Sequence, residues 1–237
     1  MKIGTKKLLW VLVSVTLIVA ASIPVLNLQS EKIATGLNVN RDKLIIVDAG
    51  HGGFDGGAVA FDGTVEKDIN LEISMVLSEM LASHGYDVIM TRTTDTGTED
   101  DFTKPIQTRK VSDLKNRLSL MNKYPNAVFV SIHLNKFTAS SAKGAQVFYS
   151  KNHPDSYTLG DSIQATIKSK LQPDNPRVIK QGTRSTYLLY NAKIPAVIVE
   201  CGFISNNEEL QKLKDDKYKK QLAFAVFCGI NDFFGER

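Results

Sequence analysis

The stretch LIIVDAGHGG, residues 44–53, indicates the fold of this chain, because an apolar run rich in β-branched residues leads into a glycine-rich turn with a histidine. The design recurs in VFVSIHLN, residues 128–135, and in PAVIVECG, residues 195–202. Continuous apolar runs of this kind are typical of strands that are buried on both faces of a sheet. A histidine or a glutamate therefore lies at the end of each of three predicted strands.

Helical patterns separate these strands along the chain. In several segments apolar residues recur at every third or fourth position, which is the spacing of a helix that buries one face. Strands that alternate with helices predict a single α/β domain, whose mostly parallel sheet is covered by helices on both faces. In such sheets, ligands bind at the carboxyl ends of the strands. The predicted strands are 43–48, 87–91, 127–132, 145–149, 186–189 and 195–200, and the predicted helices are 66–83, 109–123, 207–213, 218–233 and one within 153–171.

The amino-terminal residues predict export. Three lysines precede residues 8–26, which are apolar apart from three hydroxyl residues. This pattern is typical of a secretory signal peptide or of a single membrane span. The residues VAA at 19–21 suit a signal-peptidase cleavage site. A cleaved signal peptide and an uncleaved anchor therefore both stay open. We expect a signal peptide or an N-terminal membrane anchor over 1–27, a polar linker over 28–41, and an exported, extracytoplasmic domain over 42–237.

The composition is that of a globular protein. Of the 237 residues, 43% are hydrophobic and 23% are charged, which suits one domain with a short appendage. The net charge of +4 falls to +1 without the three amino-terminal lysines, and the remaining charges are mixed in sign. We therefore expect no nucleic-acid partner. Cys201 and Cys228 lack metal-ligand spacing and are expected to be buried thiols, although a disulfide stays open in an exported protein.

Two histidines and a glutamate predict a metal centre. His51 lies in the glycine-rich turn, His133 follows a strand, and Glu66 begins a helix that holds its carboxylate rigidly. Such a set leaves a zinc ion one open position, which a hydrolytic zinc site needs. The ion lowers the pKa of its water to about 7. Glu200 is then the expected base, which takes a proton from the water and passes it to the departing nitrogen.

These residues resemble a known family, the zinc-dependent N-acetylmuramoyl-L-alanine amidases of type 3, which hydrolyse bacterial cell walls. The resemblance rests on DAGHGG (48–53), Glu66, Arg117 and Asn122 ahead of VSIHLN (130–135), and PAVIVECGFISN (195–206). It implies that His51, Glu66 and His133 bind one zinc ion and that Glu200 is catalytic. One departure is Ala49, which stands where the family usually has proline and touches no ligand.

The same resemblance implies a sheet of about six strands and a substrate. The substrate is peptidoglycan, and the bond cut is the amide between the lactyl group of N-acetylmuramic acid and L-alanine of the stem peptide. With no wall-binding module predicted, the architecture is most similar to sporulation-type amidases of the spore cortex, which act in muramic lactam formation and germination. A vegetative cell-wall autolysin is the alternative. Because a bare wall hydrolase endangers the cell, we also expect a regulatory protein partner. Residues 1–27, if uncleaved, would add contact with the membrane.

Three further residues have candidate roles. Asn135 can hydrogen-bond a substrate carbonyl or hold its own loop, and Arg184 can pair with a carboxylate of the stem peptide. Asp48 can accept a hydrogen bond from His51 or from backbone amides of the turn. Two other functions stay open at this point. One is a wall-binding regulator without catalysis on the same scaffold, and the other is a non-haem iron oxygenase, since two histidines and a carboxylate also bind iron.

Overall fold

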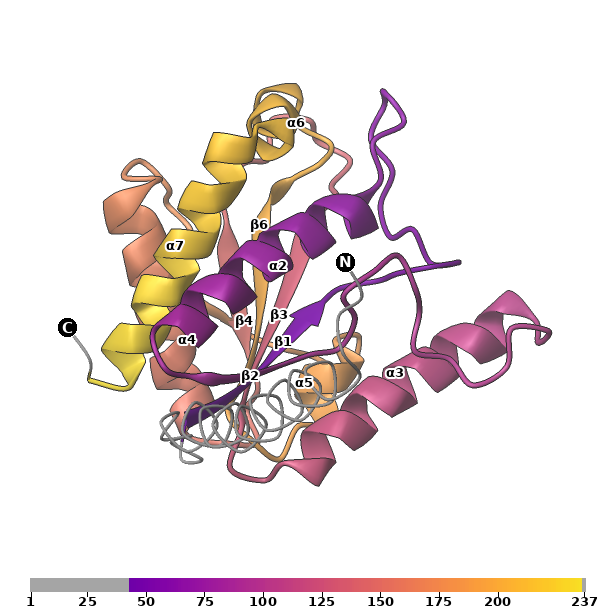
Figure 1. The fold of residues 1–237 in the computed structure, drawn as a ribbon. Coiled ribbons are helices and arrows are strands. Elements are labelled where there is room, and N and C mark those ends of the chain that lie inside the picture. Colours follow the sequence, from indigo (N-terminus) through magenta and orange to yellow (C-terminus); the bar gives the residue numbers. More distant parts are fainter. Residues whose placement is uncertain (1–42, 236–237) are drawn as a thin grey trace, which may run out of the picture. The chain divides into compact units, whose positions relative to one another are not determined.

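The computed structural model describes residues 43–235, whose fold is drawn in Figure 1. The predicted signal or anchor over 1–27 and the linker over 28–41 lie outside the described residues. Among the helices of 43–235, none has the length and apolar character needed to cross a membrane. The elements are β1 (Leu44–Ala49), α2 (Glu66–Ser83), β2 (Asp87–Met90), α3 (Ile106–Lys123), β3 (Val128–Asn135), β4 (Gln146–Tyr149), α4 (Asp155–Lys170), β5 (Lys180–Gln181), α5 (Tyr187–Asn191), β6 (Ala196–Phe203), α6 (Asn207–Lys214) and α7 (Asp216–Phe233).

A six-stranded sheet forms the centre of the domain, with the strand order β2-β1-β3-β6-β4-β5. Strands β1, β2, β3 and β6 run parallel, β4 runs antiparallel to β6, and β5 runs parallel to β4. Four of the five neighbouring pairs are therefore parallel, which confirms the predicted α/β class and the mostly parallel sheet. Because β1, β3 and β6 are neighbours, their carboxyl ends meet at one edge.

Helices cover both faces of this sheet (Figure 1). Helices α2, α4, α6 and α7 bury their apolar side chains against one face, together with Val47 of β1 and Val199 of β6. Helices α3 and α5 cover the other face, where Ile46 and Ile198 lie. Side chains alternate between these two clusters along each strand. The position of a residue within its strand therefore decides which set of helices it meets.

The ends of β3 and β6 position the candidate site. His133 and Glu200 are register partners, and both strands continue beyond them rather than ending there as predicted. A bulge follows His133, after which Asn135 pairs with Phe203. Paired residues of neighbouring strands project to the same face of a sheet. By this alternation all four side chains lie on the face that α3 and α5 cover.

One predicted strand is a helix. Residues 186–189 were expected to be extended, but α5 begins at Tyr187. The backbone N–H of Tyr190 donates to the carbonyl of Thr186 at 2.9 Å and closes the turn, and the side-chain amide of Asn191 donates to the carbonyl of Tyr187 at 2.8 Å. A short apolar run does not distinguish a strand from a buried helical turn, because it contains too few residues to show a period. The two exposed residues of β5 carry no apolar signal and were not predicted.

Candidate active site

Three side chains converge where β1, α2 and β3 meet. Nε2 of His51 lies 3.3 Å from Oε1 of Glu66, and Nδ1 of His133 lies 3.1 Å from the same oxygen. The three donor atoms all lie within 4.8 Å of one another. The two imidazole rings stand edge to face, with their centroids 4.9 Å apart. The fold thus brings together the three side chains that the sequence pattern singled out.

Glu66 is the fixed member of this group. Its Oε1 accepts a hydrogen bond from the backbone N–H of Leu134 at 3.0 Å, and its Oε2 accepts one from Ala58 at 2.8 Å. Burial opposes the charged carboxylate, but His133 and His51 favour it and hold the pKa of Glu66 well below its ordinary value. The site therefore contains a rigid, buried negative charge.

His51 is held in a strained turn. Its φ of +62° lies in the left-handed region, which costs a residue other than glycine roughly 1–3 kcal/mol. Two glycines make room for the rings: a Cβ on Gly50 would overlap the imidazole of His133, and a Cβ on Gly57 would lie 2.6 Å from Oε2 of Glu66. The glycine-rich sequence of the turn is therefore what allows the imidazoles and the carboxylate to approach.

Asp55 orients His51. Nδ1 of His51 lies 2.9 Å from Oδ2 of Asp55, whose Oδ1 lies 2.8 Å from Nζ of Lys110 on α3. The contact turns Nε2 of His51 toward Glu66. Burial opposes the protonated ring, but the hydrogen bonds to Asp55 and Glu66 outweigh it and raise the pKa of His51 to about 9. Asp48 was considered for this role from the sequence; the structure gives it to Asp55.

Asp48 instead anchors the turn through α3. Its buried carboxylate accepts hydrogen bonds from Nη1 of Arg117 and from the hydroxyls of Thr91 and Ser131. Burial opposes the charge on Asp48, but Arg117 outweighs it and lowers the pKa of the carboxyl. Arg117 is itself buried and donates through Nη2 to the carbonyl of His51 at 2.7 Å. The ion pair therefore fixes the strained backbone directly.

Arg92 holds the same turn through further hydrogen bonds. Its Nε donates to the carbonyl of Ala49 at 2.9 Å, and its Nη2 donates to that of Gly50 at 3.1 Å. Arg117 shares the carbonyl of Ala49, at 3.0 Å. Arg92 is only 4% exposed, and the sequence analysis did not identify it. The sequence pattern that could have identified Arg92 is its position just after the carboxyl end of β2.

Glu200 faces the group from β6. It is the register partner of His133, and its Oε2 is shielded from solvent with no hydrogen-bond partner among residues 43–235. Burial raises the pKa of the Glu200 carboxyl to about 7, with His133 opposing the rise and Glu66 adding to it. A carboxyl with this pKa can take up and release a proton near neutral pH.

The donor types, and two of the three distances between the donor atoms, suit a tetrahedral metal ion. Zinc binds imidazole nitrogen and carboxylate oxygen at about 2.0–2.2 Å, which places tetrahedral ligand atoms roughly 3.3–3.6 Å apart. The separations from Glu66 to His51 and His133, 3.3 and 3.1 Å, are close to these values. A cavity of about 150 Å³, lined in part by both imidazoles, opens beside them. Ligand types, spacing and adjacent space are therefore those of a site that can hold an ion and a water.

Asn135, Arg184 and the two cysteines, which the sequence analysis also considered, make few contacts that bear on the site. The backbone carbonyl of Asn135 accepts a hydrogen bond from Ile204 at 2.8 Å. Arg184 is exposed, with its Nε 3.2 Å from the hydroxyl of Tyr190. Cys201 is a buried free thiol, and Cys228 is a partly buried one. Both cysteines are thus free thiols, as expected, but only Cys201 is fully buried as predicted, and burial raises its pKa.

Comparison with known proteins decides the family. Residues 45–232 match the family model Amidase_3, which is described as N-acetylmuramoyl-L-alanine amidase. This chain belongs to that family. It is therefore an enzyme, an amidase that acts on peptidoglycan, and not a non-catalytic binding protein.

Relatives are similar over most of the amidase. The germination-specific N-acetylmuramoyl-L-alanine amidase of Bacillus subtilis (strain 168) is 35% identical over 195 residues, which are 82% of this chain and 81% of the relative. The CwlD amidase from Clostridioides difficile, solved in complex with the GerS lipoprotein, has 40% identity and a TM-score of 0.78 over 81% of this chain and 98% of that chain. Another solved amidase, from Clostridium difficile 630, has 30% identity and a TM-score of 0.71 over 82% of this chain and 98% of that chain.

Replacing Arg117 with methionine should lower the free energy of unfolding of the amidase by about 3–5 kcal/mol, because Asp48 would stay buried without its cation. Urea unfolding, followed by circular dichroism, measures the change. Adding Asp48→Asn to Arg117→Met should recover part of the loss, since no unpaired buried charge would then remain. A double variant that loses the full sum of both single losses would contradict this pairing.

Proposed function

We propose that this amidase binds one zinc ion through His51, Glu66 and His133, and that Glu200 moves the protons of the reaction. The reaction is hydrolysis of the amide between the lactyl group of N-acetylmuramic acid and L-alanine of a stem peptide. The carboxyl of Glu200 carries the proposal, since its buried Oε2 has no hydrogen-bond partner among residues 43–235, its pKa is raised, and the residue lies in register with His133. A buried carboxylate with a purely structural role would have hydrogen-bond partners.

Each residue has a distinct part in the proposed mechanism. When bound, zinc supplies a Lewis acid that polarises the amide carbonyl and makes water more acidic. Glu200 accepts a proton from the attacking water at Oε2 and then donates it to the leaving nitrogen, which becomes the free amine of L-alanine. Asp55 keeps Nδ1 of His51 occupied, so that Nε2 stays directed at the ion. Asn135 is positioned to donate a hydrogen bond to a substrate carbonyl, because it lies on the same face as His133.

Replacing Glu200 with glutamine should remove turnover and leave the metal in place, because glutamine cannot accept the proton. We expect kcat to fall by about 10²–10⁴-fold, with the zinc content unchanged by elemental analysis. Mass spectrometry of muropeptides treated with the wild-type enzyme should show free stem peptides that begin with L-alanine. Intact muropeptides after treatment with fully zinc-loaded protein would overturn the proposal. Elemental analysis of protein purified without added metal distinguishes zinc from iron.

Metal-free protein should lose stability as the pH rises from about 6.5 to about 9. The folded state raises the pKa of His51 from 6.5 to about 9, so its proton stabilises the fold fully below 6.5, and that contribution disappears as the ring deprotonates. Zinc binding requires the deprotonated ring, so zinc affinity should rise over the same pH interval and binding should release protons. Urea unfolding at each pH, with and without zinc, measures the first effect, and calorimetry in buffers of different ionisation enthalpy measures the second.

Glu200 is the other group of the site whose pKa lies near this pH interval, since burial raises it to about 7, below the value of about 9 for His51. The Glu200→Gln variant removes this group and is therefore the control for the pH profile. The variant should therefore keep the loss of stability between pH 7 and 9. A metal-free profile that stays flat over this interval would contradict the role given to His51.

We also propose a cellular role and a partner. The amidase acts outside the cytoplasm on spore-cortex peptidoglycan, delivered or anchored by residues 1–27, where removal of stem peptides prepares the formation of muramic lactam. The germination-specific relative in Bacillus subtilis supports this role. The CwlD amidase of Clostridioides difficile forms a complex with a lipoprotein, and we propose a lipoprotein of this kind as the regulatory partner.

A strain of the source organism that lacks this amidase should form spores without muramic lactam in their peptidoglycan, while its vegetative wall stays unchanged. Chromatography of muropeptides from both walls measures this. A copy of the gene with Glu200→Gln should fail to restore the lactam, which separates catalysis from a structural contribution. Normal lactam together with altered separation or lysis of growing cells would favour the vegetative autolysin instead.

A further inference from the structure

Arg177 has a guanidinium held in place by three contacts. It lies in the segment between α4 and β5, where its Nε donates to the carbonyl of Lys143 at 2.7 Å. Its Nη1 donates to Oε1 of Gln146 at 3.2 Å, and the guanidinium carbon lies 4.5 Å from the centroid of the Phe203 ring. The amide of Gln146 is itself oriented, because its Nε2 donates to the carbonyl of Val178 at 2.7 Å. The cation is therefore fixed before any ligand arrives.

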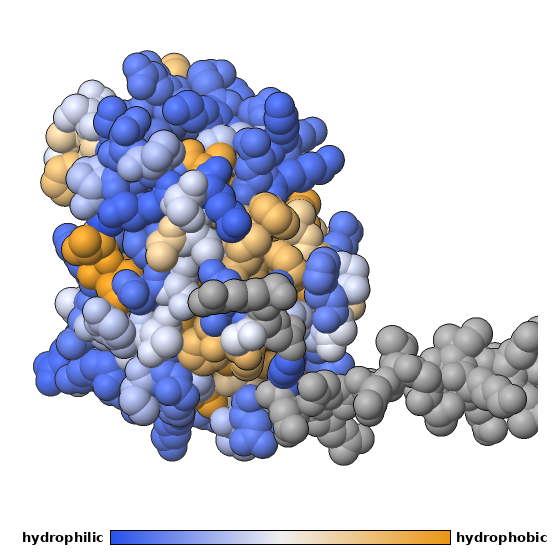
Figure 2. Space-filling model, turned by 90° about the vertical axis from the view of Figure 1, so that its left-hand side faces the viewer, coloured by the Kyte–Doolittle hydropathy of each residue, from blue (hydrophilic) through white to orange (hydrophobic). Residues whose placement is uncertain are grey.

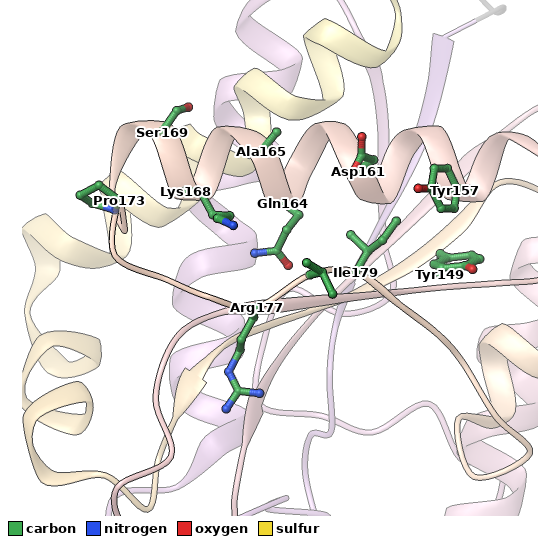
Figure 3. Close-up of a pocket in the computed structure, with 11 residues that line it drawn as sticks. Tyr149, Tyr157, Asp161, Gln164, Ala165, Lys168, Ser169, Pro173, Arg177 and Ile179 are labelled. Carbon is green, nitrogen blue, oxygen red and sulfur yellow. The ribbon is translucent and has the colours of Figure 1, made fainter.

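These contacts place the guanidinium on the face of the sheet that carries the active site. Gln146 on β4 is the register partner of Glu200, and Phe203 is the partner of Asn135. Register partners project to the same face, so the side chains that Arg177 contacts lie on the same face as Glu200. Figure 3 agrees, since it shows the guanidinium of Arg177 pointing away from α4, and α4 packs on the opposite face of the sheet.

The groove that Figure 3 draws lies on the α4 side of Arg177. It measures about 680 Å³, and hydrophobic and hydrophilic side chains both line it, among them Tyr157, Ile179 and Lys168. Figure 2 looks at the side of the molecule where α4 and α7 lie, and hydrophobic side chains form separate patches there among hydrophilic ones. Neither feature specifies a ligand. Arg177 also lines this groove, but its guanidinium points away from α4, and that group has the defined charge and geometry that can specify a ligand.

Arg177 has no acidic partner among residues 43–235, although other arginines do. Arg109 pairs with Glu99, and Arg117 pairs with Asp48 and is almost fully buried. A guanidinium has five N–H donors in a planar fork, and Arg177 uses one on Nε and one on Nη1 within the protein. The donors that remain along its Nη1–Nη2 edge match the two oxygens of a carboxylate.

The distance from the catalytic carboxyl suits a peptide. Neighbouring strands lie about 4.8 Å apart, so Arg177, one strand and one side chain beyond Glu200, lies on the order of 10 Å from it. An extended peptide covers about 3.3–3.6 Å per residue. The second or third residue of a stem peptide whose first amide lies at Glu200 therefore reaches Arg177, and stem peptides carry free carboxylates.

We propose that Arg177 binds a carboxylate of the stem peptide and thereby selects substrates with acidic stems. This inference rests on the proposed function, because it places the scissile amide at Glu200. It differs from the expectation for Arg184, which is exposed and whose Nε contacts the hydroxyl of its neighbour Tyr190. Gln146 is a positioning residue, since it acts on the substrate only through Arg177.

The test compares two substrates. One is an N-acetylmuramoyl peptide with free stem carboxylates, and the other is the same peptide with those carboxylates converted to carboxamides. Wild-type enzyme should show a KM about 10- to 100-fold lower for the carboxylate form, as expected for charge-assisted hydrogen bonds. Arg177→Gln should raise the KM for the carboxylate form by that factor with little change in kcat, which is the signature of lost uniform binding. Its KM for the carboxamide form should stay within about twofold of wild type.

Two matched variants make the comparison specific. Lys180→Gln removes the same charge from an exposed residue of β5 and should leave both KM values unchanged. Arg177→Lys keeps the charge without the planar fork and should restore only part of the preference. Loss of the preference in Arg184→Gln but not in Arg177→Gln would overturn the assignment, as would an equal rise in KM for both substrates, which indicates a structural role.

The outcomes also separate this inference from the proposed function. If zinc-loaded wild-type enzyme cleaves neither peptide, the proposed function fails. If it cleaves both with the same KM, the proposed function stands and the role of Arg177 is wrong. This second comparison uses wild-type protein alone, so it remains decisive even if Arg177→Gln fails to fold or loses zinc, which circular dichroism and elemental analysis detect.

Discussion

The buried ion pair between Asp48 and Arg117 is the interaction on which the candidate site depends. It connects the end of β1 to α3, and Arg117 uses its other donors to hold backbone carbonyls of the glycine-rich turn. A buried charge without its partner is costly, so this connection cannot loosen without a loss of stability. The turn carries His51 at positive φ, a conformation that persists only where its surroundings determine it. The geometry of the proposed metal ligands therefore depends on a charge pair that includes none of them.

The register between β3 and β6 is the second constraint, because it brings two kinds of chemistry to one place. It sets Glu200 beside His133 on the same face, where burial raises the pKa of the glutamate, while the buried carboxylate of Glu66 stays charged against the two imidazoles. On the other side of β6, Glu200 pairs with Gln146 of β4. The side chain of Gln146 in turn accepts a hydrogen bond from Arg177. Proton transfer and recognition of the stem peptide are thus proposed to share one row of side chains across the sheet.

Sequence patterns identified the three metal-ligand candidates and Glu200, because each lies beside a strong local signal: a β-branched run, a glycine-rich turn or the start of an amphipathic helix. They missed Asp55 and Arg92, whose parts depend on how separate segments pack around the turn. They left two roles open for Asp48, to orient His51 or to accept from backbone amides of the turn, because its position next to the turn does not reveal that Arg117 pairs with its carboxylate and Asp55 with His51. The helix α5 was predicted to be a strand, because its five residues are too few to show a helical period.

By itself the sequence determined the α/β class, the mostly parallel sheet and the residue types available for chemistry at the strand ends. These depend on local backbone sterics and on apolar periodicity, which neighbouring residues decide. Only the tertiary structure decided which carboxylate orients His51, why the pKa of Glu200 is raised, and on which face of the sheet the guanidinium of Arg177 lies. Those properties arise from burial, strand register and distances between segments far apart in the chain, and no short stretch of sequence contains them.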